Sequence, residues 1–222
     1  MQKQTYFTQE TIQEKSQELL EYVSASRCRH TDLIFRPEKA ALLVLDMQTY
    51  FLESDSHAFV PSAPAIILGI NKLISAFETA SRPVIATRHL NTNEDAGMMS
   101  KWWRDLINSQ NAHSHYINKL KISNCTSINK TQYDAFLNTT LEETLRQRDV
   151  EQVVITGVMT HLCCETTARS AFMRGFEVFF TVDGTATYNE ELHYASLLTL
   201  SHGFAVPVLI DELLVAMEHD AA

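Results

Sequence analysis

Three residues that can do chemistry each lie near a point where a strand is expected to end. Asp46 ends the run AALLVLD, Lys130 follows CTSIN, and Cys163 comes shortly after QVVITGV. The carboxyl ends of parallel strands meet at one edge of an open α/β sheet, where such proteins build their active sites. An acid, a base and a thiol at this edge predict nucleophilic catalysis. Asp46 would take the proton of the thiol and later protonate the leaving group.

The position of Cys163 predicts an activated thiol. It opens the helix-like stretch CCETTARSAFMRG, where backbone N–H groups converge and the helix dipole is positive, so we expect a lowered pKa. A lysine between Asp46 and Cys163 would hold the acid ionised and favour the thiolate. Each residue has a structural alternative when it is read alone: Cys163 as a small core residue, Asp46 as a loop cap and Lys130 as a surface lysine. Cys164, about 100° further round a helix, is the internal control.

Composition excludes several classes of function. The chain has 222 residues, 45% of them hydrophobic, which suits one α/β domain. A net charge of -9 argues against nucleic-acid binding and against anionic membranes. The start MQKQTYFTQE has no apolar signal core, no stretch is long enough to span a membrane, and the cysteines have no disulfide or metal spacing. We expect a reduced, cytoplasmic protein. The cysteines are Cys28, Cys125, Cys163 and Cys164.

Apolar runs alternate with helical patterns from about residue 40, which predicts a mostly parallel sheet with helices on both faces. Residues 8–25 read as an amphipathic helix capped by Thr8, with Phe7 packing onto Ile12. We expect an N-terminal helical extension over 1–35 and one domain over 36–222. The predicted strands are 40–46, 83–89, 126–130, 152–158, 177–184 and 206–211, and the predicted helices are 65–80, 141–148, 164–174 and 190–202.

Three segments together carry a specific resemblance. VLDMQTYFL, NKTQYDAFLNTTLEETL and ITGVMTHLCCETTARSAFMRGFEVFFTVDGTAT occur in this order between about residue 36 and the end of the chain. They resemble the acid, lysine and nucleophile motifs of the isochorismatase-like cysteine hydrolase superfamily. Any one alone would be a weak signal, whereas the ordered set is a strong one.

The resemblance implies a fold and a mechanism. The fold would be a Rossmann-like three-layer α/β/α sandwich around a six-stranded sheet, with a cis peptide bond between Val158 and Met159. Asp46, Lys130 and Cys163 would form a catalytic triad, and the N–H groups of Met159 and Cys163 an oxyanion hole. It further implies a small-molecule substrate, no cofactor and a homo-oligomer, either dimer or tetramer.

The family also contains isochorismatases proper, which cleave a vinyl ether without a nucleophile. The C-terminal half resembles them, but they carry Gly where this chain has Cys163 and Tyr where it has Met159. Their substrate-binding Gln and Arg align with His89 and Ala96, so a carboxylate partner is missing. We therefore expect hydrolysis of an amide-type C–N bond, with vinyl-ether hydrolysis, Asp46 acting as the acid, as the alternative. A binding module without catalysis is disfavoured, because buried charges are costly to keep without a use.

A metal is not expected. The nicotinamidase branch holds one with an Asp-x-His pair and a further histidine, whereas the second strand here ends in Thr87-Arg88-His89. The remaining histidines of interest are His57, His113 and His115, and His-x-His in a polar stretch is usually solvated.

Seven residues are candidates for binding the substrate. Packing is the alternative for the aromatic ones, and a cap-region position is the alternative for His161. Arg88 is a further residue that could face the substrate, whereas Asp183 is expected to be architectural. Trp102 and Trp103 fall in the irregular segment 91–124, which is long for a plain loop. The seven candidates are His89, Trp102, Trp103, Tyr133, Phe136, Val158 and His161.

Overall fold

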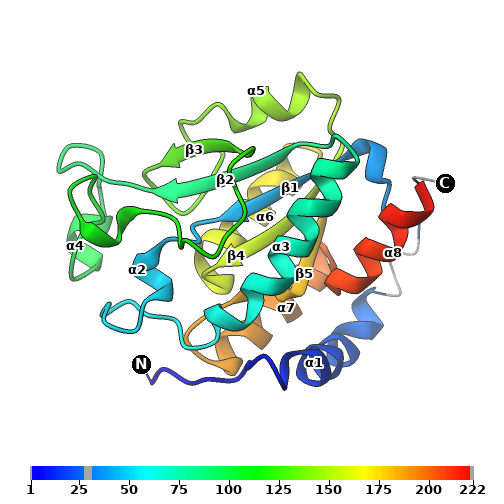
Figure 1. The fold of residues 1–222 in the computed structure, drawn as a ribbon, viewed down its shortest axis with the longest axis horizontal. Coiled ribbons are helices and arrows are strands. Elements are labelled where there is room, and N and C mark those ends of the chain that lie inside the picture. The colour runs from blue at the N-terminus through cyan, green and yellow to red at the C-terminus, as the bar shows by residue number, and fades with distance from the viewer. Residues whose placement is uncertain (1, 28–31, 221–222) are drawn as a thin grey trace.

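The structure, a computed structural model, describes residues 2–27 and 32–220. Its centre is a six-stranded sheet in the order β3-β2-β1-β4-β5-β6, and each neighbouring pair is parallel (Figure 1). The predicted Rossmann-like sheet is therefore confirmed. The strands are β1 (Ala40–Leu45), β2 (Val84–His89), β3 (Thr126–Lys130), β4 (Gln152–Val158), β5 (Glu177–Ala186) and β6 (Val206–Val208).

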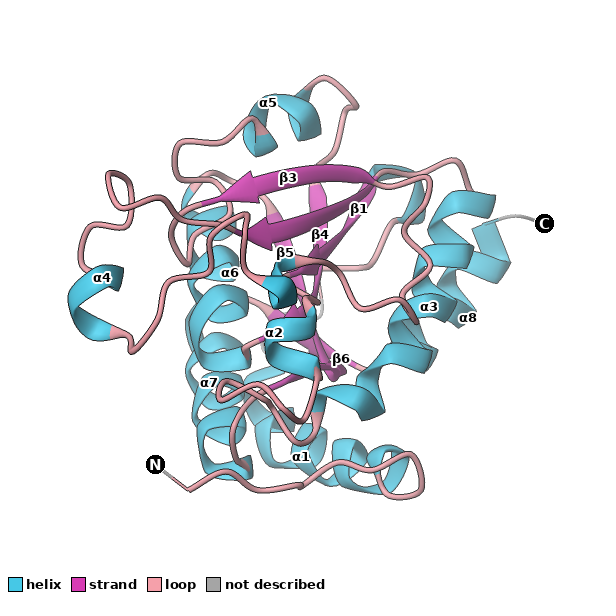
Figure 2. Ribbon diagram, turned by 60° about the vertical axis from the view of Figure 1, so that its left-hand side comes forward, coloured by secondary structure: helices cyan, strands magenta, loops and turns pink. Residues whose placement is uncertain are grey.

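Helices on both faces of the sheet complete the three layers (Figure 2). α3 and α8 pack together on one face, and α6 and α7 lie on the other. Among the described residues, none of the helices combines the length and apolar character needed to cross a membrane. The α-helices are α1 (Ile12–Arg27), α2 (Thr49–Leu52), α3 (Ala63–Thr79), α4 (Met99–Trp102), α5 (Leu141–Arg146), α6 (Glu165–Met173), α7 (Glu190–Gly203) and α8 (Ile210–Asp220). Shorter turns are η2 (Pro37–Lys39), η3 (Ala112–Ser114) and the π-helical η4 (Thr160–Cys164).

The complete burial of the two central strands explains why both were easy to predict from the sequence. All residues of β1 and β4 are buried, because helices cover both sides of the sheet. Such strands read as continuous apolar runs rather than alternating ones. Polar residues then appear where the strands end, and the parallel arrangement brings these ends to one edge of the sheet.

The last predicted strand is partly wrong. β6 ends at Val208, and α8 begins at Ile210, where we expected a strand continuing to residue 211. Asp183 on β5 explains the early helix, because its Oδ1 accepts a hydrogen bond from the Ile210 N–H at 2.9 Å. Glu212 accepts a second from the Leu209 N–H at 2.9 Å. These bonds satisfy donors at the start of α8, and they give Asp183 the architectural place that the sequence suggested.

The N-terminal segment packs against the body of the protein. α1 contacts α7, β5 and β6, with Leu19, Leu20 and Val23 buried as predicted. The helix begins at Ile12, later than expected, and the Thr8 carbonyl accepts from the Ile12 N–H at 3.0 Å. Phe7 lies against Tyr6 and His193. The division of the chain into an extension and a domain at residue 36 stays a prediction.

Gly157 is required by the close approach of β4 to β1. Its φ is +111°, and a Cβ at this position would overlap backbone atoms of Leu45, the residue before Asp46.

We expect Gly157→Ala to lower the free energy of unfolding by about 3 kcal/mol or more, measured by urea denaturation. Gly203→Ala is the matched control, since a Cβ there meets nothing within 4 Å. Equal stability of the two variants would contradict this reading.

Candidate active site

The fold brings Asp46, Lys130 and Cys163 together. Lys130 Nζ lies 2.7 Å from Asp46 Oδ2 and 3.3 Å from Cys163 Sγ. All three side chains are buried, Cys163 being the most accessible at 5% exposure. The ammonium therefore stands between the carboxylate and the thiol, which is the place that we expected for this lysine.

The Asp46 carboxylate is held from two sides. Thr87 Oγ1 on β2 donates a hydrogen bond to Oδ1 at 2.7 Å, while Lys130 pairs with Oδ2. Asp46 itself follows β1 with a φ of +51°, and its N–H donates to the Thr87 carbonyl at 3.2 Å. A positive φ is uncommon for a residue other than glycine. Backbone and side chain are thus both fixed by the neighbouring strand.

Lys130 is an ammonium surrounded by acceptors. Besides Asp46 and Cys163, it donates to the Gln132 carbonyl at 2.9 Å and lies 3.5 Å from His89 Nδ1. Burial acts to lower the pKa of Lys130, but the charges of Asp46 and Cys163 outweigh it, so the net shift is upward. The amine therefore stays protonated despite being excluded from water.

His89 faces this ammonium as a neutral imidazole. Burial first, and then the Lys130 charge, lower the pKa of His89 to about 4. His89 Nε2 lies 2.7 Å from Asn91 Oδ1, an atom that only accepts hydrogen bonds. Nε2 must then carry the ring proton, which leaves the lone pair of Nδ1 directed at Lys130.

The expected activation of Cys163 in the free protein is wrong. Cys163 does not open an α-helix; it lies in the π-helical turn η4, which precedes α6. Burial, followed by the Asp46 charge, raises the pKa of the Cys163 thiol to about 12, and Lys130 only partly opposes them. Burial removes the hydration that a thiolate would need, and the nearby Asp46 carboxylate repels a second negative charge, so both effects favour the thiol. The resting state is therefore the neutral thiol.

Cys164 serves as the internal control that the sequence suggested. It is fully buried within the hydrophobic core, whereas Cys163 lines a cavity. Burial raises the pKa of Cys164 well above its usual value. Cys125, Cys163 and Cys164 are free thiols, and Cys28 lies outside the described residues.

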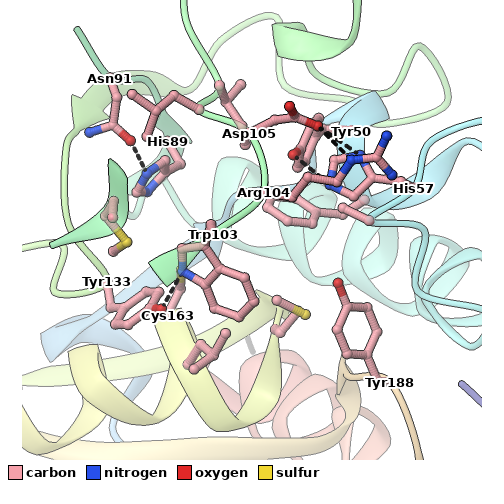
Figure 3. A pocket seen from close by; sticks show the side chains of 17 residues that line it. Tyr50, His57, His89, Asn91, Trp103, Arg104, Asp105, Tyr133, Cys163 and Tyr188 are labelled. Carbon is pink, nitrogen blue, oxygen red and sulfur yellow. Dashed lines mark hydrogen bonds and ion pairs between the residues drawn. The ribbon is translucent and has the colours of Figure 1, made fainter. Parts of the chain in front are cut away.

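A cavity of about 160 Å³ opens onto Cys163 and is bordered largely by aromatic and apolar side chains (Figure 3). Three of the seven predicted binding residues line this cavity, namely His89, Trp103 and Tyr133, and Met159 lines it as well. The other four lie elsewhere. Trp103 Nε1 donates to the Tyr133 hydroxyl at 2.7 Å, which joins the segment 91–124 to the turn after β3. The expected cis peptide bond between Val158 and Met159 is present.

The remaining predicted binding residues do not border the cavity. Trp102 is the last residue of α4 and is 73% exposed, whereas the backbone turns extended at Trp103 and directs that side chain elsewhere. Phe136 stacks on Phe176 instead, with ring centroids 5.9 Å apart. His161 Nδ1 contacts Thr187 Oγ1 at 2.6 Å, and Val158 is fully buried at the end of β4. Arg88, the further candidate, bonds to Asn129 on β3.

Several lining residues were not among the predicted binding residues. Tyr50 lies within the acid motif on α2, His57 lies in the loop after α2, and Tyr188 lies between β5 and α7. The Tyr50 hydroxyl lies 3.2 Å from His57 Nε2, and His57 Nδ1 lies 3.5 Å from Asp105 Oδ2. These contacts join α2 and two loops around the mouth of the cavity. The further lining residues are Phe51, Ala58, Asn91, Met99, Arg104, Leu106, Ile107 and Leu162.

The residues at the end of β2 do not fit a metal site. His89 and Asn91 are hydrogen-bonded to each other, and the other ring nitrogen of His89 faces the Lys130 ammonium. A metal cation bound to that nitrogen would be repelled by the ammonium. His113 lies instead 3.8 Å from Asp55. Within the described ranges, no three His, Cys, Asp or Glu side chains gather as a metal would require.

The buried pair makes a prediction about stability. Lys130→Met would leave Asp46 without its partner in a site that excludes water, so we expect a loss of about 3–5 kcal/mol in the free energy of unfolding, measured by urea denaturation. Adding Asp46→Asn removes the stranded charge and should restore most of this loss. A double variant as unstable as Lys130→Met would contradict the pairing.

Alkylation tests the state of the thiol. Iodoacetamide should label Cys163 before Cys164, because only Cys163 lines the cavity. With a pKa of about 12, the labelling rate should rise steadily from pH 7 to 10 without a plateau. Peptide mass spectrometry of Cys164→Ala, with Cys163→Ala as the control, separates the label on these two sites from any on Cys28 and Cys125. A plateau near neutral pH would show a thiolate at rest.

Comparisons with known proteins agree with this geometry. Residues 40–212 match the isochorismatase domain family. Nicotinamidase 3 of Arabidopsis thaliana is 41% identical over 179 residues, which cover 78% of this chain and 86% of that protein. Enterobactin synthase component B of Escherichia coli is 30% identical, over 83% of this chain and 66% of that protein. The solved structure of a cysteine hydrolase from Pseudomonas syringae superposes with a TM-score of 0.80 at 27% identity, over 83% of this chain and 95% of that one. The chain therefore belongs to the isochorismatase family.

Proposed function

We propose that this protein is a cysteine-dependent amidohydrolase that cleaves the C–N bond of a small amide through a covalent intermediate on Cys163. The observation that carries the proposal is the buried Lys130 ammonium, placed 2.7 Å from a carboxylate and 3.3 Å from a thiol that borders a cavity. Asp46, Lys130 and Cys163 then act as the catalytic triad.

In the first half of the reaction, Asp46 takes the proton of the Cys163 thiol as the sulfur attacks the carbonyl carbon of the amide. The negative charge passes to the former carbonyl oxygen, which the N–H groups of Met159 and Cys163 would stabilise. Collapse of this intermediate breaks the C–N bond. The leaving nitrogen takes the proton from Asp46, and ammonia departs from a primary amide.

In the second half, Asp46 takes a proton from water as the water attacks the thioester carbon. The C–S bond breaks, the carboxylic acid is released, and the proton on Asp46 returns to Cys163. Lys130 stays protonated throughout, because its pKa is raised by the charges on both sides. It stabilises whichever neighbour carries the negative charge.

For the substrate, we propose a carboxamide on a small planar ring, such as nicotinamide. The 41% identity to a plant nicotinamidase supports this choice. The cavity supports it as well, since rings of Tyr50, Trp103, Tyr133 and Tyr188 border it. Aromatic walls favour a flat apolar body, which would leave the carboxamide directed toward Cys163.

Vinyl-ether hydrolysis remains the second candidate because enterobactin synthase component B is 30% identical to this chain. The site favours it less. Ala96, at the position where the resemblance places a substrate-binding Arg, is fully buried and brings no charge to the cavity. A thiol next to a shared ammonium also has no use in a reaction without a nucleophile.

Two further expectations concern the cellular location and the self-association of the protein. A free Cys163 must stay reduced to act, which supports the expected cytoplasmic location. Exposed apolar side chains on α6 and α7, namely Phe172, Met173 and Leu198, support the expected self-association.

Substitution of the nucleophile tests the proposal. Cys163→Ala should lower kcat on nicotinamide by about 10⁴-fold or more, and Asp46→Asn by about 10²–10⁴-fold, measured by ammonia release. Cys164→Ala is the matched control, and it should retain activity because Cys164 does not border the cavity. Rapid quenching followed by mass spectrometry should find an acyl group on Cys163.

Two outcomes would contradict the proposal. Full turnover by Cys163→Ala would exclude covalent catalysis. Release of pyruvate from isochorismate by both the wild type and Cys163→Ala, without any amide turnover, would establish the second candidate instead.

A further inference from the structure

We infer that residues 2–7, here called the strap, hold the mouth of the substrate cavity in shape, and that Lys3 is the positioning residue at its centre. The strap precedes the segment that matches the isochorismatase domain, which begins at residue 40. It runs along the lower edge of Figure 1 as the first dark-blue stretch of the chain. The inference rests on the proposed function only in taking this cavity as the substrate site.

Two loops form the part of the mouth that the strap contacts. One is the loop 53–62 between α2 and α3, which supplies His57 and Ala58 to the cavity. The other is the loop 187–189 between β5 and α7, which supplies Tyr188. Figure 3 shows the rings of His57 and Tyr188 bordering the same cavity. Both loops lie outside the sheet, so strand pairing does not fix them.

The strap binds the loop 187–189 at successive residues. The Gln4 N–H donates to the Tyr188 carbonyl at 2.7 Å, and the Thr187 N–H donates to the Tyr6 hydroxyl at 2.9 Å. Asn189 Nδ2 donates to the Gln2 carbonyl at 3.2 Å. Each residue of the loop is therefore tied to the strap.

The strap binds the loop 53–62 at three further points. Lys3 Nζ donates to the carbonyls of His57 and Phe59, at 2.6 and 2.7 Å. The N–H groups of Tyr6 and Phe7 both donate to Ser62 Oγ, at 2.9 and 3.0 Å. Lys3 is the charged donor among these ties, and hydrogen bonds from an ammonium are stronger than those between neutral groups of similar exposure.

Lys3 also joins the two loops directly. The same ammonium that holds the His57 and Phe59 carbonyls lies 4.5 Å from the centroid of the Tyr188 ring, within the range of a cation–π contact. Between described residues, no hydrogen bond connects 53–62 to 187–189 without the strap. His57 in turn contacts Asp105, so the position of the loop that carries Asp105 also depends on Lys3.

The chemical centre lies apart from this tie. Asp46, Lys130 and Cys163 are fixed by β1, β2, β3 and η4, whereas the hydrogen bonds of Lys3 go to the loop 53–62. Substitution of Lys3 should therefore change substrate binding and leave Asp46, Lys130 and Cys163 in place. The expected signature is a change in KM rather than in kcat.

The test compares Lys3→Met with Lys15→Met in the full chain. Lys15 pairs with Glu190 on the surface and touches no cavity wall, so its loss removes the same charge without loosening the mouth. Lys3→Met should raise KM for nicotinamide about fivefold or more with kcat within about twofold, because a charged hydrogen bond to each of two loop carbonyls is lost. Lys3→Arg should restore the wild-type KM.

Alkylation of Cys163 gives a second measurement that needs no turnover. In Lys3→Met, the rate with bulky iodoacetanilide relative to iodoacetamide should rise about fivefold, since a looser mouth admits the larger reagent. Unchanged KM and an unchanged ratio of rates would overturn the inference, as would equal changes in Lys15→Met. If the wild type hydrolyses no amide, the proposed substrate class fails, and the ratio of rates still decides the role of Lys3.

Discussion

The ammonium of Lys130, shared between Asp46 and Cys163 away from water, is the interaction on which the site depends. A buried ion is tolerated only where its neighbours compensate for lost hydration. Here the carboxylate, the Gln132 carbonyl and a neutral His89 do so. The parallel sheet serves this arrangement, because it brings the ends of β1, β2 and β3 to one edge beside η4.

A neutral thiol at rest is consistent with catalysis once the charges are counted. Asp46 and Lys130 together carry no net charge before the reaction. Moving the proton from Cys163 to Asp46 transfers the negative charge across the ammonium without creating a new buried ion. Because Lys130 contacts both partners, this transfer costs far less than ionising an isolated buried thiol. The high pKa of Cys163 in the free protein therefore describes the resting state and does not forbid attack on a bound amide.

The sequence predicted the groups that end strands better than the groups in loops. Asp46 was found because an apolar run stops there, whereas Lys130 follows a weaker strand and was chosen for its partners; a parallel sheet then dictates their meeting. Trp103 could not be separated from Trp102, since the side chain that faces the cavity depends on where the short helix α4 ends, and no sequence pattern marks that point. The raised pKa of Cys163 was also out of reach, because it depends on burial and on a π-helical turn that has no sequence pattern.

The division of roles between the sheet and the loops explains how relatives that are named for different activities can share one fold. The family domain supplies the strands and the residues at their ends, and these fix where bonds are made and broken. The shape of the mouth comes from loops such as 53–62 and 187–189, which the sheet does not hold. His89 lies at the boundary, contacting Lys130 on one side and the cavity on the other. Substrate choice can therefore change through the loops and their ties, while the shared ammonium and its two partners stay in place.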